Sequence, residues 1–143
     1  MRRVERSALM PYPADAMFTV VNDVASYPGF LPWCAGSEVL SESPQEVIAR
    51  LDLSGAGIRK SFTTRNRLQR PDSISMSLVE GPFSSLDGQW RFIQMGDTGS
   101  KIEMVLVFDM DNRMMNFAFS RVFDAAARKM VEAFCQRADH LYG

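Results

Sequence analysis

Apolar side chains recur at helical spacing over residues 112–142, the last long stretch of the chain. This stretch contains no glycine or proline, and its charged residues fall on the face opposite the apolar one. At about 1.5 Å rise per residue, the pattern predicts a terminal helix roughly 40 Å long. The predicted apolar face consists of Phe119, Val122, Phe123, Ala126, Met130, Phe134, Ala138 and Leu141.

The middle of the chain instead alternates apolar and polar residues, in runs separated by glycine, proline and aspartate turns. Alternation with a period of two predicts strands that have one buried face and one wet face. Short turns between these runs favour an antiparallel meander. The runs lie at 47–53, 58–68, 74–78, 86–92 and 102–110, with shorter apolar segments at 5–10 and 39–40.

Two short helices are predicted between the first two strands. Pro13 suits the first turn of a helix over 14–24, and Ser26 is a candidate N-cap for a second helix around 27–31. The sequence therefore predicts one α+β domain over residues 1–143. Its antiparallel sheet of about six to seven strands would wrap around the long terminal helix.

Composition narrows the class of protein. The chain has 143 residues, 46% of them hydrophobic, and a net charge of −1, so no global charge attracts nucleic acid or an anionic membrane. No apolar run approaches the roughly 20 residues that span a bilayer. The basic start at 1–6 leads into no apolar signal segment. We expect a cytoplasmic protein, and peripheral contact with the inner face of the membrane is the alternative.

Few residues suit catalysis or metal binding. His140 is the single histidine and lies near the end of the terminal helix, so no second histidine is present to build a zinc site. Cys34 lies in an apolar stretch far from Cys135, and Glu103 and Asp109 fall on the polar phase of their strand. We predict no catalytic residues, no metal and no enzymatic activity. A cyclase that works by shaping its substrate is kept as an alternative.

A sheet wrapped around one helix encloses apolar space, which is either a filled core or a ligand cavity. Ten methionines favour a deformable interior. Thr64 and Asn66 share the inward phase of Phe62, and buried polar groups need partners such as a ligand carbonyl. The candidate cavity residues are Phe62, Thr64, Asn66, Met76, Leu78, Trp90, Phe92, Met104, Leu106, Phe108, Phe119, Phe123, Ala126, Ala127, Met130 and Phe134.

Two further surfaces are candidates for binding. The segment 27–33 would be a lid at the cavity mouth, suited to a bilayer interface or simply capping the core. On the wet phase of one strand, Arg59, Arg65 and Arg67 would form a patch for ribosomal RNA or anionic lipid, or an ordinary solvated face. The candidate mouth residues are Tyr27, Phe30, Leu31, Pro32 and Trp33.

Two segments, 22–34 and 81–92, are more specific than this pattern requires. Together with 62–66 and 134–138, they resemble the START-like (Bet v 1-like, SRPBCC) coenzyme Q-binding and ribosome-association-toxin family. Some members of this family are labelled oligoketide or polyketide cyclases. The resemblance implies a helix-grip fold with a hydrophobic cavity.

The resemblance also implies a function. Our first expectation is a protein that binds ubiquinone or a related prenyl lipid and supports respiration, with that lipid as ligand and no required cofactor. The alternative is a toxin that binds the large ribosomal subunit and inhibits translation initiation. A polyketide cyclase is the further alternative, and DNA is not an expected partner.

Overall fold

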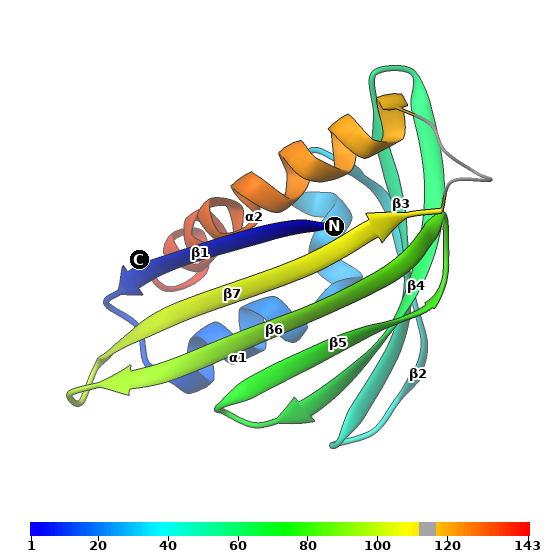
Figure 1. Ribbon diagram of the computed structural model, residues 1–143. Helices are drawn as coiled ribbons and strands as arrows, with labels where there is room; N and C mark the ends of the chain where they lie inside the picture. The colour runs from blue at the N-terminus through cyan, green and yellow to red at the C-terminus, as the bar shows by residue number, and fades with distance from the viewer. Residues whose placement is uncertain (112–116) are drawn as a thin grey trace.

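The computed structural model describes residues 1–111 and 117–143. The described residues form one strand, a short α-helix, a 3-10 helix, six more strands and a long α-helix, arranged as in Figure 1. In chain order the elements are β1 (Arg2–Met10), α1 (Ala14–Asn22), η1 (Val24–Gly29), β2 (Cys34–Glu42), β3 (Glu46–Gly55), β4 (Ile58–Gln69), β5 (Ser73–Glu80), β6 (Phe83–Met95), β7 (Gly99–Met110) and α2 (Phe117–Tyr142).

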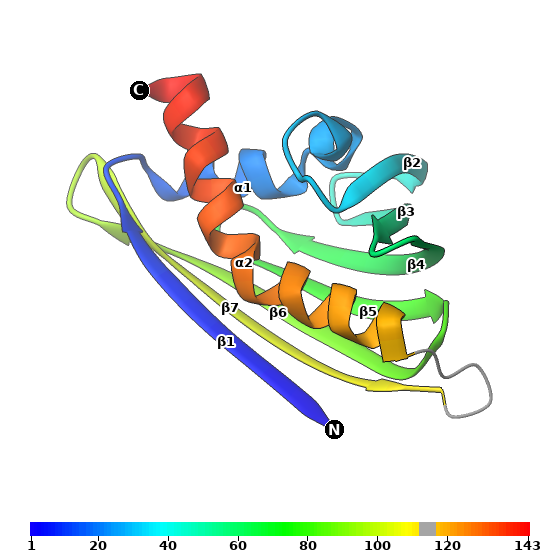
Figure 2. The ribbon, with the colours of Figure 1, turned by 90° about the horizontal axis from the view of Figure 1, so that it is seen from above.

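The strands form one antiparallel sheet in the order β1-β7-β6-β5-β4-β3-β2. The sheet curves around α2, which crosses its concave face, while the opposite, convex face carries no helix (Figures 1 and 2). This arrangement confirms the predicted α+β helix-grip fold, with seven strands.

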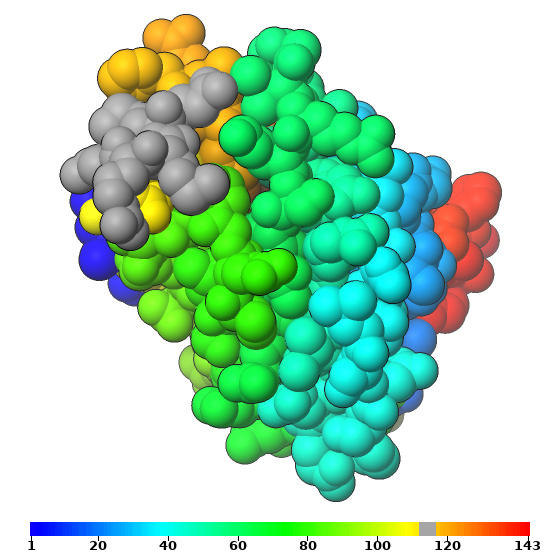
Figure 3. All heavy atoms as spheres, turned by 90° about the vertical axis from the view of Figure 1, so that its right-hand side faces the viewer, coloured from blue at the N-terminus to red at the C-terminus, as the bar shows by residue number. Residues whose placement is uncertain are grey.

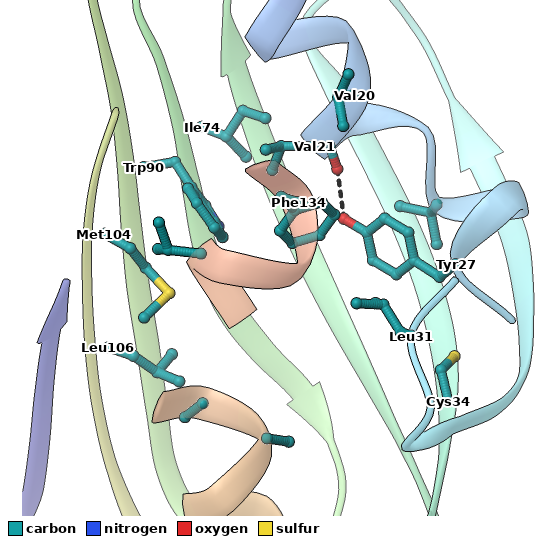
Figure 4. Packing of buried hydrophobic residues seen from close by; sticks show 14 of the residues in the cluster. Val20, Val21, Tyr27, Leu31, Cys34, Ile74, Trp90, Met104, Leu106 and Phe134 are labelled. Carbon is teal, nitrogen blue, oxygen red and sulfur yellow. Dashed lines mark hydrogen bonds between the residues drawn. The ribbon is translucent and has the colours of Figure 1, made fainter. Parts of the chain in front are cut away.

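Strand register decides which side chains enter the core. Along β7, Ile102, Met104, Leu106 and Phe108 are buried and alternate with half-buried or exposed residues. The ring of Phe134 on α2, only 1% exposed, lies 5.3–5.6 Å from the rings of its three aromatic neighbours. Phe134 therefore joins α2 to the sheet and to η1, as Figure 4 shows for Trp90 and Tyr27. Those three neighbours are Tyr27, Phe30 and Trp90.

Several predicted boundaries were wrong. The helix α1 ends at Asn22, and η1 spans Val24–Gly29. Asp23 is the N-cap of η1 and accepts a 2.6 Å hydrogen bond from the Ser26 hydroxyl, so Ser26 is not the cap. Leu141 is 48% exposed, because the last turn of α2 contacts Tyr12 through Tyr142 instead. The predicted helical residues 112–116 lie outside the described residues.

Candidate functional site

A small internal cavity lies between the sheet and α2. Its volume is about 40 Å³, and its lining is almost entirely apolar. Of the predicted cavity residues, those that line it are Phe62, Thr64, Asn66, Met76, Trp90, Leu106, Phe123, Met130 and Phe134.

The other predicted cavity residues lie elsewhere. Met104, Phe119 and Ala127 are buried core residues that do not reach the cavity. Phe92 packs against Phe18 of α1, and Phe108 packs against Phe83 and Phe123. Leu78 is half-buried on β5, and Ala126 faces an outer groove. An inward-facing position on a strand or on α2 therefore identifies a core residue, but not every core residue reaches the cavity.

Sequence reasoning missed part of the cavity wall. Val24, Ala49, Leu51 and Leu86 line the cavity without having been predicted to do so. Ala49 and Leu51 share the inward phase of β3, as Leu86 does on β6, so strand alternation could have identified these three. Val24 belongs to the irregular η1, where no periodic pattern indicates its direction.

The cavity holds one polar pair. The Thr64 hydroxyl donates a 3.0 Å hydrogen bond to the Asn66 side-chain carbonyl, and both residues are buried. Both side chains line the cavity, where the other lining residues are almost all apolar. An amide and a hydroxyl at this place in an apolar lining suit a ligand that carries a carbonyl oxygen.

The predicted mouth residues divide between core and surface. Tyr27 is buried, donates its hydroxyl to the Val21 carbonyl, and lines the internal cavity; burial raises the pKa of this phenol. Leu31 is fully buried in the core. The other three line an open groove of about 540 Å³ between the lid, the end of β3 and α2. These three are Phe30, Pro32 and Trp33.

The predicted arginines lie on the convex face but differ in their partners. Arg59 lies 3.5 Å from Asp52, and Arg65 lies 3.5 Å from Glu46. Arg67 is exposed and forms no ion pair with any described residue. The three arginines are therefore not a uniformly basic patch.

Arg67 instead belongs to a polar strip that crosses β4, β5 and β6. Cross-strand register places Arg67 opposite Ser75, and Ser75 opposite Gln89. Arg65 faces Ser77, and Ser73 faces Arg91. Figure 3 shows the face formed by β2 to β5 with no helix across it. We call these residues the convex strip: Arg65, Arg67, Ser73, Ser75, Ser77, Gln89 and Arg91.

Catalytic chemistry finds little support among the described residues. They contain no cluster of histidine, cysteine, aspartate and glutamate able to hold a metal. Burial raises the pKa of the Cys34 thiol, and burial also raises the pKa of Cys135 to about 11, so both thiols stay protonated near neutrality. None of the described helices combines the length and hydropathy needed to cross a bilayer.

Asp52 organises one end of the convex face. It accepts a 2.6 Å hydrogen bond from the Ser61 hydroxyl, and its carboxylate lies 3.3 Å from Arg50. The Ser61 bond, opposed by burial and aided by Arg50 and Arg59, holds the pKa of Asp52 below its ordinary value of 3.8. The ionised carboxylate therefore stabilises the fold above that value, and the contribution is lost as pH falls through the folded-state pKa.

Asp52→Asn is expected to lower the free energy of unfolding at pH 7 by about 1–2 kcal/mol, because Ser61 and the arginines lose a charged acceptor. The variant should also lose less stability than the wild type between pH 5 and pH 3, followed by urea denaturation. Asp97→Asn, at an exposed turn, is the control and should match the wild type. Identical acid sensitivity in Asp52→Asn and the wild type would contradict this account.

Comparison with known proteins identifies the family. A family described as polyketide cyclase / dehydrase and lipid transport matches residues 10–135. The chain belongs to this family.

Several close relatives are named as toxins. The chain is 47% identical over 142 residues to the persistence and stress-resistance toxin PasT of Escherichia coli O6:H1 and 46% identical to the ribosome association toxin RatA of Escherichia coli K12. Each alignment covers 99% of this chain and 90% of the relative.

More distant relatives carry other names. The mitochondrial coenzyme Q-binding protein COQ10 homolog B of Xenopus laevis is 25% identical over 149 residues, covering 99% of this chain and 61% of that protein. Two solved structures share the fold. The 18 kDa protein CC1736 of Caulobacter crescentus has a TM-score of 0.75 at 32% identity, covering 100% of this chain and 99% of that one. The Zhui aromatase/cyclase of a Streptomyces strain has a TM-score of 0.81 at 21% identity, covering 96% and 93%.

Proposed function

We propose that this protein associates with the large ribosomal subunit and inhibits translation initiation. The observation that carries the proposal is the identity of 46–47%, spread over almost the whole chain, with relatives named ribosome association toxin and stress-resistance toxin. Since the alignments span the full sheet and α2, the proposed function belongs to the fold as a whole.

The convex strip is the surface best suited to ribosomal RNA. Arg67 forms no ion pair with any described residue, although Glu46 lies opposite it and Asp87 lines the same hollow. The Arg91 side chain is 61% exposed, with Glu103 at 3.5 Å. Guanidinium groups bind phosphate oxygens, and serine hydroxyls and glutamine amides add neutral donors. The net charge of −1 gives no long-range attraction, so binding would depend on this local arrangement.

Sucrose-gradient profiles of a translating extract test this function. Added protein should deplete assembled ribosomes, increase free subunits and migrate with the large subunit. An unchanged profile, with the protein remaining at the top of the gradient, would overturn the proposal. Neither outcome depends on a ligand in the internal cavity.

A second function, binding of a carbonyl-bearing prenyl lipid such as ubiquinone, is favoured by the polar pair Thr64 and Asn66 in an otherwise apolar cavity. The name of the Xenopus relative supports the same ligand class. A volume of about 40 Å³ holds a water or two rather than a prenylated quinone. Met76 and Met130 line the cavity, and their flexible side chains would let it enlarge. Binding in this role is non-enzymatic and cytoplasmic, with peripheral membrane contact during loading.

Asn66→Leu is expected to weaken binding of decylubiquinone by about tenfold, because one buried hydrogen bond to the quinone carbonyl is removed. The dissociation constant is measured by quenching of tryptophan fluorescence. Ser77→Ala, on the convex face, is the control and should bind like the wild type. Organic extraction and mass spectrometry of gently purified protein gives an independent readout. Equal affinities for Asn66→Leu and the wild type would remove Asn66 from the site, and an empty extract without quinone uptake would end this second proposal.

A further inference from the structure

Two hollows meet at Trp33, the last residue of the lid segment 27–33. One is the internal cavity of about 40 Å³, and the other is the outer groove of about 540 Å³ along α2. Trp33 lines both, and no other described residue does so. The side chain of Trp33 therefore lies between the smaller, more enclosed hollow and the open groove.

The backbone of Trp33 is held by a hydrogen bond, whereas its indole N–H has no partner among the described residues. The Trp33 carbonyl accepts a 2.8 Å hydrogen bond from the Ser54 amide, and the neighbouring Leu31 is fully buried. The indole N–H is buried without a hydrogen-bond acceptor among the described residues. A buried unpaired donor costs free energy, so rotation of the indole toward the groove would restore a partner in water.

The groove has room for such a rotation. Its α2 wall presents small side chains at Ala125, Ala126 and Ala133, and Gly55 lies at the end of β3. Together the two hollows fall in the range of about 300–1,000 Å³ that is typical of small-molecule sites. The enclosed cavity alone does not.

We propose that Trp33 is a gate whose outward rotation joins the internal cavity to the α2 groove and forms one ligand site. The site would take an uncharged molecule with a carbonyl-bearing ring and an apolar chain. The ring would reach Asn66 inside the cavity, and the chain would lie in the groove along Val122 and Ala133. This inference rests on the second proposed function for its ligand, but the gate itself can be tested without it.

The chain contains two tryptophans, so Trp33→Ala and Trp33→Phe each leave Trp90, a cavity residue, as the sole tryptophan. Phe keeps the bulk of the gate and Ala removes it. Stopped-flow quenching of Trp90 by decylubiquinone should be about tenfold faster in Trp33→Ala than in Trp33→Phe, because the side-chain barrier is gone. The control is the double variant Leu40→Ala/Trp33→Phe, in which the added substitution lies at an exposed position on β2. Its quenching rate should equal that of Trp33→Phe.

Acrylamide, a small neutral quencher, separates the gate from the ligand. Its quenching constant for Trp90 should rise in Trp33→Ala relative to Trp33→Phe. If acrylamide reaches Trp90 more readily in Trp33→Ala but decylubiquinone does not bind, the gate stands and the quinone proposal fails. Equal acrylamide access in both variants, with native circular dichroism, would overturn the gate. Trp33→Leu replaces Trp33→Ala if the latter does not fold, and the same increase is expected.

Discussion

Reversing the charges of Arg67 and Arg91 together is expected to lower the affinity for large ribosomal subunits by roughly two orders of magnitude at low salt, because two attractions to phosphate become repulsive. The logarithm of the binding constant should also fall less steeply with salt, by about 0.7–0.9 in slope for each phosphate interaction that the variant removes. Pelleting of protein with purified subunits over a series of potassium chloride concentrations measures both quantities.

A matched control is available on the other side of the molecule. Lys129→Glu reverses an exposed charge on α2, across the sheet from the convex strip, and should leave subunit binding nearly unchanged. In Arg67→Glu the new carboxylate faces Glu46 across the strands, and repulsion between the two is expected to lower stability slightly. Arg67→Gln repeats the binding test without that repulsion. Wild-type affinity in the doubly reversed variant, or weakened binding in Lys129→Glu, would show that binding does not use the convex strip.

Phe134→Ala is expected to lower the free energy of unfolding by about 3–5 kcal/mol, the usual cost of truncating a buried phenylalanine. Phe134 lies 5.3 Å from the ring of Tyr27 and 5.4 Å from that of Trp90, so the truncation loosens α2 from both η1 and the sheet. The truncation also enlarges the cavity that Phe134 lines. Urea denaturation followed by circular dichroism measures the decrease in stability.

Phe117→Ala makes the same substitution on the same helix at a position that is 77% exposed. It should change the free energy of unfolding by less than about 0.5 kcal/mol. A similarly small effect in Phe134→Ala would mean that α2 is held by interactions other than this aromatic cluster.

The sequence was sufficient for the fold because its two periodicities are strong. Ile102 to Phe108 alternate strictly along β7, and Phe119, Phe123 and Ala126 return to one face of α2. Both patterns follow from burial of one face, which local sequence records directly. The start of η1 was misplaced because its residues follow no regular period, and Asp23 is its N-cap by position, with no capping hydrogen bond from its side chain.

The site was less predictable because the period of apolar residues shows which face of an element is buried, but not which of the buried side chains reach the cavity. Trp90 and Phe92 share one phase of β6, yet only Trp90 reaches the cavity, since Phe18 of α1 packs against Phe92. Likewise, Arg59 and Arg67 share one phase of β4, but of the two only Arg59 lies within ion-pair distance of an acid among the described residues, although Glu46 is opposite Arg67 in the strand register. Glu46 lies 3.5 Å from Arg65 instead, and no local pattern specifies which of the two arginines it approaches.

The most direct test of the account is a cryo-electron microscopy map of the protein bound to the large ribosomal subunit. We predict that Arg67 and Arg91 contact phosphates of ribosomal RNA, with β4, β5 and β6 facing the subunit and α2 facing away from it. A map in which α2 and its groove lie against the RNA while the convex strip faces solvent would contradict the account.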